Sequence, residues 1–253
     1  MEIIYKELGI ELTRKCNQKC SHCLRGPSEN VDLSEEVIDS LFDNNNIYLI
    51  ENLYLSGGEP TMNGKALVYL VDKIIEKRVI VGTYRVIING TYYTKEFADA
   101  IRKLHEYIDT VGWNRDYNVL YANSFGRIGI SQDQYHEEAK PEIIEKLRTL
   151  PATIIILDDE YNSKKLLPYG RALANELSIN IPDLSKLMDI EGSYSITKYG
   201  REGIQIHSQY ICSNGNVCLN PNYPYKVLDE YRIGNVLDST ILGMYGIDKK
   251  ISK

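Results

Sequence analysis

Short runs of β-branched and aliphatic residues alternate with amphipathic helical patterns along the first 157 residues of the chain. The expected strands are Ile10–Thr13, Leu53–Ser56, Arg85–Ile88, Arg127–Ser131 and Thr153–Leu157. The expected helices lie between them, at Ser34–Asp43, Lys65–Lys77, Lys95–Glu106 and Pro141–Leu150. Alternation of this kind favours parallel strands joined by right-handed helical crossovers. The sequence therefore predicts an α/β fold built on a parallel sheet.

This alternation ends after Leu157, and from about Gly192 the chain is β-rich with frequent turn signals. A chain of 253 residues is long enough for one large domain with a small appendage. We therefore place a boundary near Ile190, with a core at residues 1–190 and a smaller unit at residues 191–253.

Composition limits the class of protein. The N-terminal stretch is charged and does not have the pattern of a signal peptide, and no apolar run approaches the length of a membrane span. Five cysteines are an odd number and too sparse for a disulfide scaffold. A net charge of −6 argues against a protein that coats nucleic acid. We expect a cytoplasmic protein without a nucleic-acid or membrane partner.

Polar and glycine-rich segments follow four of the expected strands. In chain order they are the cysteine loop with Cys16, Cys20 and Cys23, then Gly57–Pro60, Asn89–Thr91 and Gln132–His136. Ligands of parallel α/β folds bind at the carboxyl ends of the strands. The sequence therefore predicts that these segments converge on one binding site.

The spacing C-x3-C-x2-C lets one loop wrap its thiolates around a single compact group. Zinc is one alternative, but structural zinc sites need four ligands, and His22 is a poor fourth because it adjoins a cysteine. A buried, inert cluster is another, but the basic residues Arg14, Lys15 and Lys19 make the stretch charged. An iron–sulfur cluster is the third, and three thiolates would leave one iron open to another ligand.

The string "KCNQKCSHC" resembles the signature of the radical SAM superfamily, which lies on the loop after the first strand of a partial (βα)6 TIM-type barrel. The resemblance implies that Cys16, Cys20 and Cys23 hold a 4Fe–4S cluster, and that S-adenosylmethionine (AdoMet) chelates the fourth iron. It also implies reductive cleavage of AdoMet to a 5′-deoxyadenosyl radical that takes hydrogen from a substrate. The sequence departs from the family at His22, where another aromatic ring is usual and a flat imidazole can fill the same place.

The string "LSGGEPTM" resembles the GGE motif of the same family. Gly57 and Gly58 lack a Cβ and let the backbone approach a ligand closely. Glu59 offers a carboxylate to the ammonium of AdoMet, and Pro60 completes the motif. The alternative is a simple turn, since Gly-Gly and Pro are common in turns.

Weaker matches supply the remaining expected AdoMet contacts. "IINGT" and "GISQD" resemble family stretches after the third and fourth strands, and they contribute Asn89, Ser131 and Asp133. The alternative for these side chains is a helix cap or an Asx-turn. "LLPYGRA" resembles a GRA segment, whose Arg171 either binds a carboxylate or lies on a helix surface.

The C-terminal part, with "CSNGNVCLNPNYPY" followed by "IGNVLDSTILGMY", resembles the SPASM and Twitch extensions of the family, in a degenerate form with only Cys212 and Cys218. Three roles remain open for these two thiols: ligands of a second metal with His207, a hydrogen-atom donor to a substrate radical, or packing inside a small β-rich cap. We expect no auxiliary cluster.

Three classes of function remain. The first is a radical SAM enzyme acting on a small molecule or a peptide, supplied with electrons by flavodoxin or ferredoxin. The second is an iron–sulfur or AdoMet-binding protein without radical chemistry, and the third is a zinc-stabilised module. Glycyl-radical activases are a further alternative within the first class. Only fifteen residues precede Cys16, which favours a small molecule or a peptide delivered by a separate partner.

Overall fold

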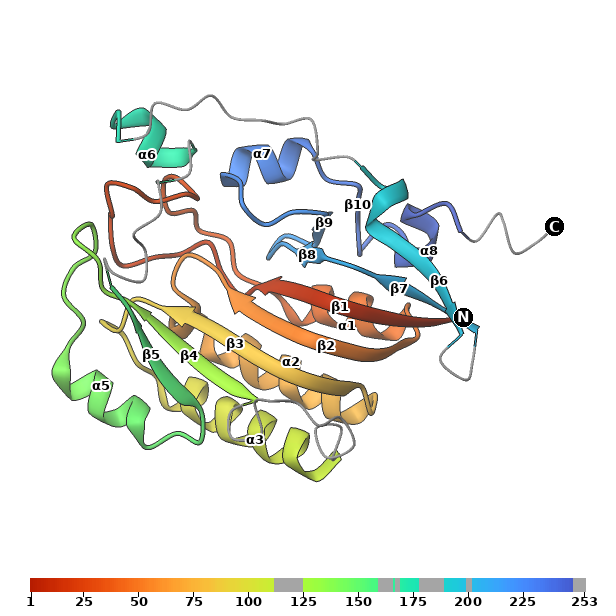
Figure 1. The fold of residues 1–253 in the computed structure, drawn as a ribbon, viewed down its shortest axis with the longest axis horizontal. Coiled ribbons are helices and arrows are strands. Elements are labelled where there is room, and N and C mark those ends of the chain that lie inside the picture. The colour runs from red at the N-terminus through yellow and green to blue at the C-terminus, as the bar shows by residue number, and fades with distance from the viewer. Residues whose placement is uncertain (112–124, 159–165, 167–168, 178–188, 199–201, 248–253) are drawn as a thin grey trace.

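The computed structural model describes residues 1–111, 125–158, 166, 169–177, 189–198 and 202–247. Five parallel strands follow one another across the sheet in chain order (Figure 1). They are β1 (Glu2–Glu11), β2 (Ile47–Ser56), β3 (Ile80–Ile88), β4 (Gly126–Ser131) and β5 (Thr153–Leu157). Each expected strand is therefore present, and the first three extend further toward their amino ends than the sequence pattern indicates.

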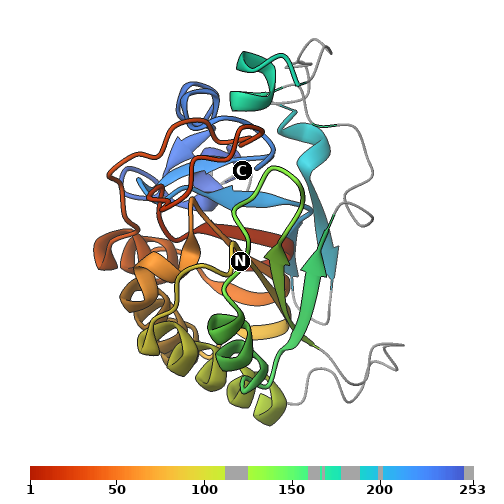
Figure 2. The same ribbon diagram turned by 90° about the vertical axis from the view of Figure 1, so that its left-hand side faces the viewer.

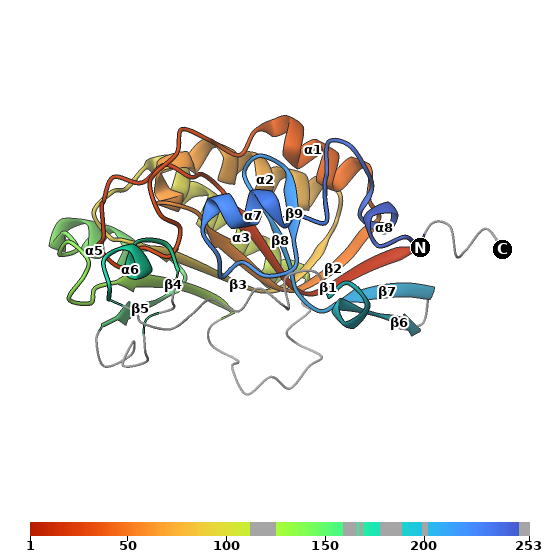
Figure 3. The ribbon, with the colours of Figure 1, turned by 90° about the horizontal axis from the view of Figure 1, so that it is seen from above.

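Helices connect successive strands, as the alternation predicts. They are α1 (Glu35–Asp43), α2 (Gly64–Glu76) after the 3-10 helix η1 (Pro60–Asn63), α3 (Lys95–Val111) and α5 (Pro141–Arg148). The Ser34 hydroxyl accepts a hydrogen bond from the backbone N–H of Val37 and caps α1. α1, α2 and α3 lie together on one side of the sheet (Figures 2 and 3).

The main core lies between these helices and the sheet. Every second residue near the carboxyl ends of the strands faces it, including Leu8, Ile10, Leu53, Leu55, Val86, Ile88, Ile128 and Ile130. α3 contributes Phe97, Ile101, Leu104 and Ile108, which recur at the three- and four-residue spacing of one helix face. The residues between these core positions on the strands consequently face the opposite side of the sheet.

The C-terminal part adds strands to the free edge of β1. β7 (Glu202–Ile206) and β8 (Gln209–Ile211) both pair with β1 in parallel. Three further strands pair in antiparallel fashion. β6 (Tyr194–Lys198) pairs with β7, β9 (Asn216–Cys218) pairs with β8, and β10 (Gly234–Asn235) pairs with β9. The short helices of this half are α6 (Gly170–Ala174), η2 (Glu191–Ser193), α7 (Tyr225–Glu230) and α8 (Ile241–Met244).

The predicted α/β class, with a parallel sheet and a β-rich C-terminal extension, is confirmed. The division of the chain at residue 190 stays a prediction. Within the described residues, no helix has the length and apolar character that crossing a lipid bilayer requires.

The contact between β1 and β8 generates a test of how the C-terminal part is held. A Cβ built on Gly9 would lie 2.5 Å from Cδ2 of Tyr210, whose ring is buried. Gly9→Ala should lower the free energy of unfolding by about 1–3 kcal/mol, because the ring has to move from a packed position. Urea unfolding measures this change.

Gly203→Ala is the matched control on the neighbouring strand β7, where the nearest atom to the added Cβ is the Glu2 carbonyl oxygen at 3.1 Å. This variant should lose less stability than Gly9→Ala. Equal stability of Gly9→Ala and the wild type would contradict the packing of Tyr210 on β1.

Candidate functional site

The loop after β1 carries Cys16, Cys20 and Cys23, and all three are free, half-buried thiols. The loop is closed at its base by a bridge between Thr13 and Asp32, where the Thr13 hydroxyl donates a 2.6 Å hydrogen bond to the Asp32 carboxylate. The loop lies at the carboxyl ends of the strands (Figure 1). The polar segments were expected to converge at this edge.

The three thiols are close enough to influence one another's ionisation. Burial, with added repulsion from Cys23 and Cys16, raises the pKa of Cys20 to about 11. Burial also raises the pKa of Cys16, and the charges of Glu59 and Cys23 add to the effect. A cationic centre beside these neighbouring thiols would favour their thiolate form, because thiolates are the species that bind a metal. The donor set therefore fits a thiolate-ligated metal group.

The glycine pair after β2 packs against the backbone of the cysteine loop. The N–H of Gly58 donates to the Thr13 carbonyl at 2.7 Å, and the N–H of Glu59 donates to the Lys15 carbonyl at 2.7 Å. A Cβ on Gly57 would lie 2.5 Å from the Thr13 oxygen, and one on Gly58 would lie 2.2 Å from the Lys15 oxygen. The backbone of the cysteine loop therefore leaves no room for a side chain at either position, whether or not a ligand also lies there.

Glu59 links the ends of β2 and β3 beneath this contact. It is 1% exposed, and its carboxylate accepts hydrogen bonds from the N–H and hydroxyl of Thr61 and from the N–H of Asn89. Burial raises the pKa of Glu59 to about 7, although these hydrogen bonds favour the charged form. Pro60, which follows, begins η1 and is buried. A role of Glu59 toward an ammonium group stays a prediction.

The segment after β3 also contacts the cysteine loop. The Asn89 amide donates to the side-chain oxygen of Asn17 at 2.8 Å, and the Asn17 amide donates to the hydroxyl of Thr91 at 2.8 Å. Asn89 accepts in turn from Thr91, through both its N–H and its hydroxyl. Asn17 lies between the first two cysteines, so the third strand end helps to fix the loop.

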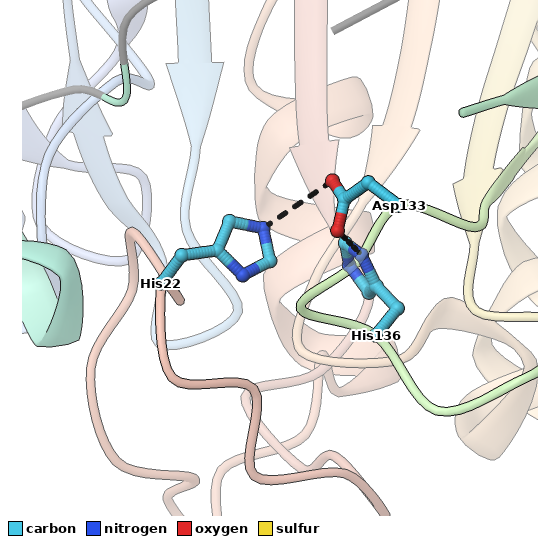
Figure 4. A group of neighbouring side chains, drawn as sticks. All are labelled: His22, Asp133 and His136. Atoms are coloured by element: carbon cyan, nitrogen blue, oxygen red, sulfur yellow. Dashed lines mark hydrogen bonds and ion pairs between the residues drawn. The ribbon is translucent and has the colours of Figure 1, made fainter. Parts of the chain in front are cut away.

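The segment after β4 brings two histidines to one carboxylate. Ser131 ends β4, and Figure 4 shows Asp133 between His136 of its own loop and His22 of the cysteine loop. Nδ1 of His136 lies 2.7 Å from one Asp133 oxygen, and Nε2 of His22 lies 3.8 Å from the other. One ring nitrogen of each histidine and one oxygen of Asp133 all lie within 4.8 Å of one another. This spacing fits a cation site, and it also fits simple hydrogen bonding between the three side chains.

This trio is also electrostatically coupled. Burial lowers the pKa of His22, the nearby His136 adds to the effect, and Asp133 opposes it. Burial acts to raise the pKa of Asp133, but hydrogen bonds from His136 and the Tyr135 N–H hold it below its usual range. Asp133 was expected to contact AdoMet and no role was expected for His136, although the spacing D-x-x-H after a strand was a usable signal.

Arg171, on α6, contacts the cysteine loop directly. Its backbone N–H donates to the Cys23 carbonyl at 2.9 Å, and its guanidinium donates to the Cys20 carbonyl at 3.1 Å. Gly170 before it has a φ of +57°, and a Cβ there would lie 2.3 Å from the Cys23 oxygen. The positive charge of Arg171 opposes the rise in the pKa values of Cys16 and Cys20.

Cys212 and Cys218 lie outside this arrangement. Their sulfurs are 3.9 Å apart on the β8–β9 hairpin, and both side chains are buried. They pack in a small cluster with Tyr169, Tyr210, Tyr223 and Leu228, which Leu24 of the cysteine loop contacts. The hydrogen bond with Cys218, together with burial, raises the pKa of Cys212. Their surroundings are therefore those of packed thiols, and the three roles considered for them stay predictions.

Arg14, two residues before Cys16, is the centre of an ionic network that the sequence did not predict. Arg14 is 1% exposed, so its charge does not mark an exposed stretch. Its guanidinium forms ion pairs with Glu11 at 2.9 Å, with Glu29 at 2.8 Å and with both oxygens of Asp229 at 2.7 Å. Asp229 lies on α7, 215 residues away in sequence. No local pattern indicates so distant a partner.

Comparisons with known proteins agree with this geometry. Residues 10–114 match the Radical SAM superfamily. A putative glycyl-radical enzyme activating enzyme of Methanocaldococcus jannaschii is 24% identical over 195 residues, covering 70% of this chain and 72% of that protein.

Two solved structures share the fold at 15% identity, with all of this chain covered. BtrN in complex with AdoMet and 2-DOIA aligns with a TM-score of 0.52 over 86% of its length. The protein anSMEcpe with bound AdoMet and the Cp18Cys peptide aligns with a TM-score of 0.57 over 82% of its length.

The contact between the glycine pair and the cysteine loop can be tested without any ligand. Gly58→Ala should lower the free energy of unfolding by about 1–3 kcal/mol, because the added Cβ overlaps the Lys15 carbonyl, which is backbone. The three loop thiols should also react faster with a thiol reagent, since the loop loses two backbone hydrogen bonds.

Gly129→Ala is the control, because its added Cβ meets side chains and no backbone, the nearest atom being Cδ1 of Leu157 at 2.9 Å. Thiol reactivity should stay at the wild-type rate in this variant. Wild-type stability and reactivity in Gly58→Ala would show that the two segments are not held together.

Proposed function

We propose that this chain is a radical SAM enzyme in which Cys16, Cys20 and Cys23 hold a 4Fe–4S cluster, at which AdoMet is reductively cleaved. When bound, such a cluster supplies the electron that splits the sulfonium of AdoMet, and the resulting 5′-deoxyadenosyl radical takes a hydrogen atom from the substrate. The observation that carries the proposal is the set of three free thiols on one loop, fixed by the ends of β2 and β3.

The remaining residues of the rim then bind and orient AdoMet. Gly57, Gly58, Glu59 and Pro60 are proposed at its methionyl end, where the buried carboxylate offers a negative charge to the ammonium. Asn89, Ser131, Asp133 and Arg171 are proposed as further contacts, all on segments that meet at this edge. The imidazole of His22 stands where the family usually has another aromatic ring, and its flat face suits stacking.

The substrate is proposed to be a small molecule or a peptide, and flavodoxin or ferredoxin is proposed as the source of electrons. Proteins of similar fold have been solved with both kinds of ligand, since BtrN is in complex with 2-DOIA and anSMEcpe has a bound peptide. Activation of a glycyl-radical enzyme is the second candidate, which the M. jannaschii relative favours. Residues 191–253 are proposed as a degenerate cap on the core of residues 1–190, in a cytoplasmic enzyme.

The cluster assignment predicts a brown protein after anaerobic reconstitution, with about four irons per chain. Alanine at positions 16, 20 and 23 together should abolish both the colour and the formation of 5′-deoxyadenosine, because no thiolate ligand remains. Iron analysis and chromatography of the nucleoside measure the two effects. A full cluster in the triple variant would refute the assignment.

The double variant Cys212→Ala, Cys218→Ala is the matched control, and its iron content should stay near four per chain. Iron that starts near eight and falls to four in this variant would reveal an auxiliary cluster. If iron is unchanged and 5′-deoxyadenosine still forms while the substrate is no longer converted, one of these thiols is the hydrogen-atom donor.

The role proposed for Glu59 gives a further prediction. Glu59→Gln keeps the shape of the side chain but removes its charge, which should weaken AdoMet binding by about 1–3 kcal/mol, or tenfold or more in affinity. Calorimetry measures the affinity, and the absorption spectrum of the cluster should be unchanged. Glu51→Gln, at a half-buried carboxylate of the preceding strand β2, is the control and should bind AdoMet normally. Wild-type affinity in Glu59→Gln would limit this residue to its hydrogen bonds with Thr61 and Asn89.

A further inference from the structure

The rim holds a second group of metal-binding side chains besides the cysteines. Figure 4 shows its members, His22, Asp133 and His136, turned toward one another from two loops. No thiol belongs to this group, whose ligand atoms are two ring nitrogens and a carboxylate oxygen. The three side chains are 17%, 6% and 14% exposed in that order. The group is therefore largely shielded from solvent, unlike the acidic clusters that are common on protein surfaces.

The two oxygens of Asp133 have different surroundings. Oδ1 accepts a hydrogen bond from the N–H of Tyr135 at 3.0 Å and lies 2.7 Å from Nδ1 of His136. Oδ2 faces Nε2 of His22 at 3.8 Å, which is longer than a hydrogen bond. Hydrogen bonding thus accounts for the position of His136 but not for that of His22.

The other ring nitrogen of His22 gives a second, independent observation. This atom, Nδ1, is buried and has no hydrogen-bond partner among the described residues. A buried nitrogen without a partner is costly, and it commonly marks the place of a water molecule or an ion. The backbone at His22 is nevertheless fixed, because the carbonyls of the residues before and after it accept hydrogen bonds from Asn175 and Arg171.

The separations of the three side chains suit one metal ion. Two ligand atoms of a zinc ion lie roughly 3–4 Å apart, because each is about 2.0–2.2 Å from the metal. The 3.8 Å between His22 and Asp133 lies within this range. The 2.7 Å between His136 and Asp133 has to open by only a few tenths of an ångström. Small rotations of the side chains are therefore enough to form the site.

The donor set selects the kind of metal. Imidazole nitrogens suit zinc and other divalent transition metals, whereas magnesium and calcium take oxygen ligands. Two imidazoles and one carboxylate supply three ligands, and they leave a position open for water or another molecule. Zinc generally binds such a site more tightly than ferrous iron does. The group should therefore hold zinc and discriminate against magnesium.

We propose that His22, Asp133 and His136 bind one zinc ion, or a chemically similar divalent transition metal, at the rim beside the cysteine loop. The ion is distinct from the proposed iron–sulfur cluster, since its ligands are two imidazoles and a carboxylate instead of thiolates. The inference goes beyond the proposed function and does not depend on it.

The test is equilibrium dialysis of the reconstituted full-length chain against a series of zinc concentrations, with zinc and iron measured in the same samples. The cluster occupies the loop thiols, and any exchange of zinc into it appears as a loss of iron. The wild type should bind about one zinc per chain without losing iron, and should retain no magnesium under the same conditions. Retention of magnesium as tight as that of zinc would overturn the inference.

Three variants remove one ligand each. Asp133→Asn keeps the shape of the side chain but not its charge, and His22→Phe keeps an aromatic ring without its nitrogens. His136→Gln removes the remaining imidazole. Each should weaken zinc binding about tenfold or more, because the loss of a residue that merely supports a ligand already costs that much.

His207→Gln is the matched control, because it also removes an imidazole, one considered above as a metal ligand with Cys212 and Cys218. Its zinc affinity should equal that of the wild type. Urea unfolding of each variant checks that the fold is retained. Absence of zinc from the wild type, or equal zinc affinity in folded His136→Gln and wild type, would overturn the inference. Loss of zinc in His207→Gln alone would place the ion in the C-terminal part and would also overturn it.

The same protein separates this inference from the proposed function. Formation of 5′-deoxyadenosine by zinc-free wild type, with dithionite as reductant and no substrate, tests only the cluster and AdoMet. If the nucleoside forms but no zinc binds, the metal site is wrong and the function stands. If zinc binds through the three residues but no nucleoside forms, the metal site stands and the function is wrong.

The metal site shares His22 and Asp133 with the proposed AdoMet contacts. Protein loaded with zinc and freed of excess metal should therefore bind AdoMet about tenfold or more weakly than zinc-free protein, because the ion takes up their ligand atoms. Calorimetry measures both affinities. Equal affinities in protein that retains its zinc would leave the metal site in place and remove these two residues from the AdoMet contacts.

Discussion

The arrangement of the rim depends on one buried cation, the guanidinium of Arg14. A charge that is 1% exposed is tolerated only when it is paired, and Glu11, Glu29 and Asp229 provide the pairing. Breaking the pair with Glu11, in which both side chains are buried, is expected to cost about 3–5 kcal/mol. Because Arg14 lies two residues before Cys16, the geometry of the thiols is linked to that of a helix near the other end of the chain. Arg25, two residues after Cys23, also ties the loop to the C-terminal part, because its guanidinium donates to the carbonyls of residues 221 and 223.

Much of the fold could be predicted because the information is local. Strand and helix patterns follow from side-chain periodicity, and the cap at Ser34 follows from residue type. The convergence of the four polar segments also follows, because parallel strands end at one edge. The pairing of Arg14 with Asp229 could not be predicted, since it joins residues 215 positions apart. The glycines after β2 were expected to approach a ligand, but their nearest neighbour is the backbone of the cysteine loop, a contact that only the tertiary structure reveals.

The carboxylates of the rim are held in place by hydrogen bonds within the protein. At the rim, two carboxylates are satisfied by the protein itself: Glu59 by Thr61 and Asn89, and Asp133 by His136. A rigid rim suits a group that must be held in a fixed position.

The pairing of β1 has a consequence for how the chain is made. β1 pairs with β2 on one edge and with β7 and β8 on the other, and β7 begins about 190 residues after β1 ends. At about 5–20 residues per second, the second edge of β1 therefore waits roughly 10 to 40 s on the ribosome for its partner. An unpaired strand edge is a template for pairing with other chains. The growing polypeptide, rather than the finished protein, is the form in which this sheet is most exposed to aggregation.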